Sequence, residues 1–187
     1  FTLDETVTPE QREVNRKFNK QSIGLAAIMK NSSLLLVLFI AFVGQFGLGL
    51  LQATFALFGE AVLFAGYSEN MISLGIGIML TLVGVGQFVT QAVLLPKALK
   101  RYDDALLVVF GLVLRTVGLF VFAALATPLL GGVASVMFAA GIGFMMPPLQ
   151  SLTTTTVADE LRGGVLGVYQ STISLSTIFS SAIAGTI

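Results

Sequence analysis

The sequence contains no cysteine and no histidine among its 187 residues. Their absence excludes disulfide bonds, thiol catalysis, haem attachment and the usual zinc sites, because each of these needs a thiolate or an imidazole. Charged residues are also scarce, at 11% of the chain, whereas a soluble domain of this size has about 25%. The formal net charge is zero, which gives no electrostatic basis for binding nucleic acid. We therefore expect no cofactor, no metal and no nucleic-acid partner.

Hydrophobic residues make up 55% of the chain, and they occur in runs of about 20. A helix needs a run of that length to cross the hydrocarbon core of a bilayer, whereas barrel strands show alternating segments of about 10 residues. The pattern predicts an all-α membrane protein, built as a helical bundle. The expected membrane-spanning helices cover residues 34–58, 71–95, 105–126, 130–152 and 163–187.

A short charged turn joins the second and third apolar runs. It carries Lys97, Lys100, Arg101, Asp103 and Asp104. Short loops rich in Lys and Arg stay on the cytoplasmic side of a membrane, so we expect this turn to lie there. Counting crossings from the turn places nine of the ten Lys and Arg residues in cytoplasmic segments and none in an outer loop. This distribution predicts a multi-pass protein of a bacterial-type plasma (inner) membrane.

The two ends of the chain differ in polarity. We expect a cytoplasmic loop over residues 1–31 and a transmembrane helical domain over residues 32–187. Within the loop, residues 22–30 fit either a short helix on the membrane surface, capped by Ser22, or more linker. A polar corner follows at Asn31. Because the chain starts without a Met and ends within an apolar run, we expect a fragment that works together with an N-terminal half of the same protein.

Polar and small residues recur at helical spacing along three of the expected spans. Small residues let helix backbones approach closely, and Ser, Thr and Gln side chains hydrogen-bond across such an interface. The same residues also suit the wall of a water-filled cavity. We interpret the Gly and Ser positions as packing. For Gln45, Gln52 and Gln87 both interpretations stay open, because an amide in lipid needs a partner. The polar stripes are Gln45, Gly49, Gln52, Ala56 and Gly59 in the first span, Ser73, Gly77, Thr81, Gly84, Gln87 and Gln91 in the second, and Gly163, Gly167, Gln170 or Ser171, Ser174, Thr177, Ser181 and Gly185 in the fifth.

Two charged residues within or beside the spans are candidates for ion coupling. Arg115 lies about 15 Å along the third span, where a charge costs roughly 2.5–3.5 kcal/mol on insertion scales. One interpretation is functional: Arg115 takes part in ion coupling or substrate binding. The other is structural: Arg115 locks helices together, or its side chain snorkels towards the cytoplasmic face. We favour the structural interpretation. Glu60 fits a proton acceptor near the outer mouth of a cavity or a solvated helix end.

Pro147 and Pro148 predict a kink or a local break in the fourth span, since neither has a backbone N–H.

Three segments of the chain resemble the second half of a major facilitator superfamily transporter. The first is FTLDETVTPEQR, which is similar to the start of the central cytoplasmic loop. The second is GQFVTQAVLLPKALKRYDD, which is similar to the eighth helix and its basic loop in drug–proton antiporters of the tetracycline-efflux type. The third is PPLQSLTTTTVADELRGGVLGVYQSTISL, which resembles the end of the tenth helix, an acidic-x-Arg-Gly turn and the eleventh helix. They lie between residues 1 and 175 in the order of the family, so the resemblance extends over nearly the whole chain.

The resemblance implies alternating access, in which two six-helix halves rock about a substrate site near the bilayer midplane. It places the first, second, fourth and fifth spans around the cavity and the third at the periphery. The basic turn would join a cytoplasmic gate whose charges bind helix ends in one conformation only. The candidate cavity residues are Gln45, Gln52, Gln87, Tyr169, Gln170 and Ser174, and the candidate gate residues are Lys97, Lys100, Arg101, Asp103 and Asp104.

The leading functional hypothesis is a proton-coupled antiporter that exports small, largely apolar compounds, as multidrug-resistance proteins do. It is based on the resemblance and on the small number of fixed charges in the polar stripes. The alternative is a transporter-like receptor or assembly subunit that binds a ligand without moving it. An enzyme is not expected, because no nucleophile–base pair and no metal cluster is visible. The expected partners are the lipid bilayer, a small-molecule substrate and protons.

Overall fold

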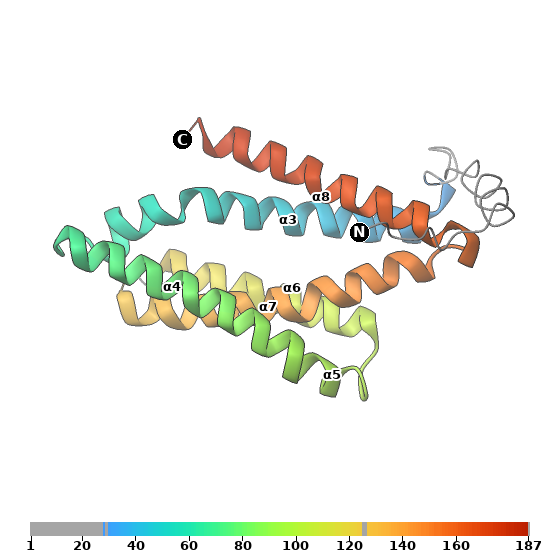
Figure 1. Cartoon of the computed structure of the whole chain (residues 1–187), viewed down its shortest axis with the longest axis horizontal. Helices are drawn as coiled ribbons and strands as arrows, with labels where there is room; N and C mark the ends of the chain where they lie inside the picture. The colour runs from blue at the N-terminus through green and yellow to red at the C-terminus, as the bar shows by residue number, and fades with distance from the viewer. Residues whose placement is uncertain (1–27, 29, 125–126, 187) are drawn as a thin grey trace, which may run out of the picture.

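The structure is a computed structural model, and it describes residues 28, 30–124 and 127–186 (Figure 1). The described residues form long helices packed side by side. Four helical stretches are long and apolar enough to cross a membrane, so the expected helical membrane bundle is confirmed. These are Ser32–Leu63, Glu69–Ala98, Asp104–Ala124 and Pro128–Thr155. The elements are α3 (Ser32–Phe58), the π-helical segment η1 (Gly59–Leu63), α4 (Glu69–Val89), the π-helical segment η2 (Thr90–Leu94), α5 (Leu95–Ala98), α6 (Asp104–Ala124), α7 (Pro128–Thr155), the 3-10 segment η3 (Asp159–Leu161) and α8 (Arg162–Ala184).

The last helix, α8, differs from the others in polarity. It has 23 residues, which at about 1.5 Å per residue is enough to cross the hydrocarbon core. It is nevertheless less apolar than the four candidate spans. Its place as a fifth span stays a prediction. The expected linker and nearly all of the expected surface helix lie outside the described residues.

Asn31 starts α3 and ties it to the end of α7. Its side-chain oxygen accepts a hydrogen bond from the Leu34 backbone N–H at 3.0 Å, which is the typical role of an N-cap residue. Its side-chain nitrogen donates to the carbonyl of Thr156 at 2.8 Å, just after α7 ends. One amide therefore satisfies a free donor of one helix and a free acceptor of another. The polar corner was expected over Asn31, Ser32 and Ser33; Asn31 caps the helix as expected, whereas Ser32 and Ser33 already belong to α3.

Replacing Asn31 by alanine should lower the free energy of unfolding by about 0.5–2 kcal/mol, the usual cost of removing an N-cap residue. The contact with Thr156 places the effect towards the upper end of that range. The measurement is denaturant unfolding of the full-length protein in micelles. Ser32→Ala is the matched control, because Ser32 is exposed and neighbours the cap. Equal stability of the two variants would contradict the capping role.

Both of the first two spans continue through a π-helical segment. The sequence predicted that the first span ends at Phe58, but η1 carries the helix on to Leu63. Glu60 therefore lies within a helical turn, and the end of the first span predicted at residue 58 is wrong. The second span likewise runs through η2 into α5, which ends at Ala98. Such π-helical turns arise where a helix takes up an extra residue, and hydropathy does not signal them.

Helix α7 is the centre of the bundle, since it contacts α3, α4, α6 and α8. It continues without interruption through Pro147 and Pro148. The alternative of a local break at these residues is wrong, and Figure 1 shows instead that the helix changes direction along its length. Prolines are tolerated inside such helices when neighbouring helices cover the freed backbone groups, and Pro148 is buried.

The closest helix crossing is between α6 and α7, and it is built on glycine. A Cβ atom on Gly141 would lie 2.7 Å from both the Gly111 carbonyl oxygen and the Arg115 backbone nitrogen. A Cβ atom on Gly111 would lie 2.6 Å from the Gly141 carbonyl oxygen. The two backbones are therefore in direct contact, as expected for small residues at membrane helix interfaces.

The connections alternate between the two ends of the bundle (Figure 1). The start of α3, the turn between α5 and α6, and the turn between α7 and α8 lie at one end, and the connection from α3 to α4 lies at the other. Apart from Arg115, the described basic residues are all at the first end: Lys30, Lys97, Lys100, Arg101 and Arg162. This arrangement agrees with the orientation inferred from the charges.

Candidate functional site

Arg115 is buried at the junction of α3, α6 and α7, with only 5% of its surface exposed. Its guanidinium lies over the ring of Phe138, 4.9 Å from the ring centroid. On the side of α3, a Cβ atom on Gly47 would lie 3.2 Å from Nη2, and one on Gly44 would lie 3.6 Å from Nη1. The contact at Gly47 would be tight and the one at Gly44 ordinary, so the glycine at position 47 leaves room for the guanidinium.

The partner of Arg115 is an aromatic ring and not a carboxylate. Within residues 28, 30–124 and 127–186, no acidic side chain pairs with it. A desolvated cation–π contact is worth up to about 2 kcal/mol, which offsets much of the roughly 2.5–3.5 kcal/mol insertion cost. This geometry fits the structural role that we favour, which stays a prediction. A role in coupling or substrate binding stays the alternative.

Helices α3 and α8 are joined by polar side chains along their seam. Ser176 donates a hydrogen bond from its hydroxyl to the carbonyl oxygen of Phe42 at 2.6 Å. The side-chain nitrogen of Gln45 donates to the hydroxyl oxygen of Thr177 at 3.3 Å. Gly49 is buried against a serine side chain of α8. Gln45 thus has the partner that a Gln amide in a membrane needs.

The other face of α8 carries polar residues that are exposed. Gln170 and Ser174 belong to this face, and so do Ser171 and Ser181. Thr177 is exposed at the edge of the face, where it also accepts the hydrogen bond from Gln45. Gly163 and Gly167 have no described atom within 4 Å of where a Cβ would lie. On α3, Gln52 is exposed as well. We name the exposed polar and glycine positions of α8 the α8 polar face. Its residues are Gly163, Gly167, Gln170, Ser171, Ser174, Thr177 and Ser181.

The stripe on α4 is also open. A groove of about 420 Å³ runs beside Ser73, Gly77 and Thr81, with Leu74, Ile78 and Leu82 as its apolar walls. No described atom comes within 4 Å of a Cβ built on Gly77 or Gly84. The glycine positions therefore divide into two groups. Gly49 and Gly59 pack against other helices, and Gly86 of α4 packs against Ala139 of α7. By contrast, a Cβ built on any glycine of the open group would meet no described atom of another helix: Gly77 and Gly84 on α4, and Gly163 and Gly167 on α8.

Three predicted site residues occupy different environments. Tyr169 is 3% exposed and belongs to the apolar core with Leu34 and Val165, so it does not lie on the exposed face of α8. Gln87 is half-buried on α4. Glu60 is exposed within η1, towards the end of the bundle opposite the basic turn. The structure does not bring these three together with the polar face.

The basic turn between α5 and α6 is well exposed. Lys97, Lys100 and Arg101 line a hollow of about 460 Å³ together with Ala98 and Tyr102. Asp104 lies in the first turn of α6, where a carboxylate interacts favourably with the helix dipole, and Asp103 precedes it and is exposed. In the part of the chain that the structure describes, none of these five charges forms an ion pair. The candidate gate residues thus have no ion-pair partner among the described residues.

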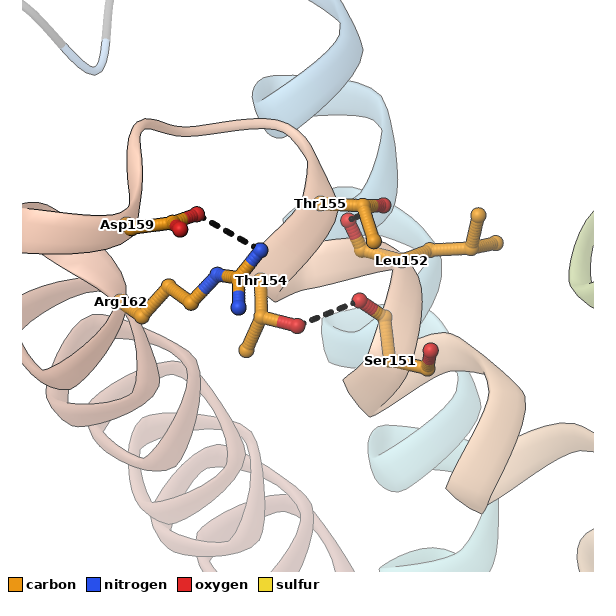
Figure 2. A network of polar contacts seen from close by, with 6 residues as sticks. All are labelled: Ser151, Leu152, Thr154, Thr155, Asp159 and Arg162. Carbon is orange, nitrogen blue, oxygen red and sulfur yellow. Dashed lines mark hydrogen bonds and ion pairs between the residues drawn. The ribbon is translucent and has the colours of Figure 1, made fainter.

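The second turn at the same end is held by its own side chains (Figure 2). Arg162 donates from Nη2 to Asp159 Oδ1 at 2.8 Å, and both side chains are exposed. The hydroxyls of Thr154 and Thr155 bond to carbonyls three residues earlier, at 2.8 and 3.0 Å. An exposed ion pair adds little stability, so its effect here is to shape the connection from α7 to α8.

The fold and these features define a helical membrane protein with a neutral polar face and a basic turn at one end. The family model described as Major Facilitator Superfamily matches residues 1–181. The chain therefore belongs to the major facilitator superfamily, a family of membrane transporters of small molecules and not of enzymes. Neither a curated protein nor a solved structure matches the chain significantly.

Proposed function

We propose that this chain forms helices seven to eleven of a proton-coupled exporter that works by alternating access on small, largely apolar compounds. The drug–proton antiporter subtype is part of this proposal. The family supports small-molecule transport across a membrane. The observation that carries the finer proposal is the α8 polar face, which is exposed while the opposite side of the same helix is buried against α3.

A polar face of this kind is costly in lipid, because hydroxyl and amide groups there lack water. It needs either a water-filled cavity or further protein to cover it. An N-terminal half of the same protein, placed against α4 and α8, would provide both. The face carries hydroxyl, amide and glycine groups with no fixed charge after Arg162, which suits a neutral or weakly polar substrate better than a strongly anionic one.

The basic turn supplies the second part of the proposal. Its Lys and Arg side chains are unpaired within the described helices, so they can bind the other half in one state and release it in the other. Such a difference in contacts is what a two-state gate requires. No observation favours the alternative of a receptor or assembly subunit.

The test is dye transport by the full-length protein in vesicles with an imposed pH gradient. We expect export of an aromatic dye that stops when a protonophore collapses the gradient. Flux that persists without the gradient would contradict proton coupling, and binding of the dye without any flux would favour the receptor alternative.

A substitution on the α8 polar face tests the cavity directly. Ser174→Leu should reduce dye flux about tenfold or more, equivalent to at least about 1.4 kcal/mol, because it blocks an exposed polar position. Leu175→Val is the matched control, since Leu175 is the exposed neighbour off the polar face. Equal flux in both variants would remove Ser174 from the substrate path. Unfolding curves for both confirm that only folded protein is compared.

A further inference from the structure

Two hollows meet at the turn between α5 and α6. The first is an apolar groove of about 400 Å³. The second is the basic hollow described above, of about 460 Å³. Ala98 and Tyr102 line both of them, so the apolar groove and the basic hollow lie next to each other. The groove is lined by Ala98, Tyr102, Leu106, Leu107, Phe110 and Phe144.

The apolar groove lies at the level where lipid chains begin. Its residues on α6 fall in the first two turns of a candidate membrane span, within about 10 Å of the span's end. Leu106 and Phe110 are about half exposed, at 53% and 50%, whereas Leu107 is buried. Phe110 and Phe144 pack edge to face, with ring centroids 5.3 Å apart, and so join α6 to α7 at the groove. The groove has the volume and the apolar lining to hold part of an acyl chain.

The basic hollow lies at the level of the lipid headgroups. Lys97, Lys100 and Arg101 are exposed in its walls, and no described carboxylate pairs with them. Asp103 and Asp104 belong to the same turn but do not line the hollow. Three positive charges therefore border the hollow without a negative charge in its walls. Tyr102 stands between the hollow and the groove, as aromatic side chains do at the membrane–water interface.

We propose that the two hollows form one binding site for an anionic phospholipid. Lys97, Lys100 and Arg101 bind the phosphate, and the groove at Leu106, Phe110 and Phe144 holds one acyl chain. Basic groups beside a span on the cytoplasmic side attract anionic lipids, which are the lipids of that leaflet. A free phosphate would fill only the basic hollow and a neutral lipid only the groove. The adjacency of a basic hollow and an apolar groove is what selects an anionic lipid.

The experiment is native mass spectrometry of the full-length protein in micelles doped with equal amounts of phosphatidylglycerol and phosphatidylcholine. We expect the protein to retain phosphatidylglycerol roughly tenfold over phosphatidylcholine. The combined substitution Lys97→Gln, Lys100→Gln and Arg101→Gln should abolish that preference. Arg162→Gln is the matched control, because it removes one exposed basic residue from the other turn and should leave the preference unchanged.

Two further arms separate the sources of binding. Ala98→Phe places a ring where the groove and the hollow meet, so it should reduce retention of both lipids. Inorganic phosphate added at the lipid concentration should not displace phosphatidylglycerol. Displacement by phosphate would show a simple anion site and overturn the proposal. Equal retention of the two lipids by the unchanged protein would overturn it too, as would a preference that survives the combined substitution. If the combined variant misfolds, Lys100→Gln and Arg101→Gln alone should each lower the preference, and no change in either would contradict the site.

Discussion

Replacing Gly141 by alanine is expected to lower the free energy of unfolding by about 1–3 kcal/mol, and leucine should cost more. The new Cβ atom would lie 2.7 Å from backbone atoms of α6 and 2.8 Å from the Cβ of Arg115. No side-chain rotation relieves a contact with backbone, so α6 and α7 must move apart. This separation would disturb the packing around Arg115 as well, because the guanidinium lies over a ring of α7.

The measurement is unfolding of the full-length protein in micelles, with Gly132→Ala as the control on the same helix. A Cβ atom on Gly132 meets only the tip of Leu82, at 3.7 Å, which is ordinary contact. Alanine also has the higher helix propensity by about 1 kcal/mol, so this control should be neutral or slightly stabilising. Equal stability of the Gly141 and Gly132 variants would show that α6 and α7 do not cross as closely as the structure indicates.

Replacing Arg115 by leucine is expected to impair folding more than substrate affinity. Leucine removes the cost of a buried charge, but it is too short to reach α3 and cannot stack on Phe138. The junction loses a contact worth up to about 2 kcal/mol and gains a void beside Gly44 and Gly47. Arg115→Lys is the informative companion, because lysine keeps the charge but lacks the planar group that stacks. If stacking matters, lysine should destabilise almost as much as leucine.

The readouts are the unfolding free energy and the KM for transport by the folded fraction. Normal folding together with lost transport in Arg115→Leu would instead place the guanidinium in the coupling or substrate path. A double-mutant cycle between positions 47 and 115 tests the structural role directly, because it measures the interaction energy of the two residues. Gly47→Val should be destabilising next to arginine, since the Cβ atom would lie 3.2 Å from Nη2, and nearly neutral next to leucine.

Much of the bundle could be predicted from hydropathy and charge. Four expected spans correspond to helices, and Asn31 begins α3 as the polar corner indicated. The ends of the first two spans were harder to predict from the sequence. Residues 59–63 and 90–94 are apolar enough to continue a helix, but only helix packing determines that they do so as π-helical turns. Hydrophobic composition does not distinguish a longer helix from an apolar loop.

The candidate site was predicted in part. The sequence identified Arg115 but not its partner, because Phe138 looks like any other apolar residue of a span. Gln45 was predicted with two open interpretations, and its bond to Thr177 crosses 132 residues of sequence. Asn31 was expected to mark a corner, yet its bond to Thr156 could not be inferred from spacing along one helix.

The sequence by itself determined that this chain crosses a bilayer as helices and that its basic residues gather at one end. Both properties depend on the free energy of transferring each side chain between water and lipid. That free energy can be assigned residue by residue, without knowing which side chains lie nearby. Only the tertiary structure decided which glycines hold helices together and which stand on an open polar face. That division depends on how two helices cross: Gly141 touches the backbone of α6, whereas Gly77 meets no described atom within 4 Å. A glycine's effect depends on what lies opposite its missing side chain, and sequence periodicity does not contain that information.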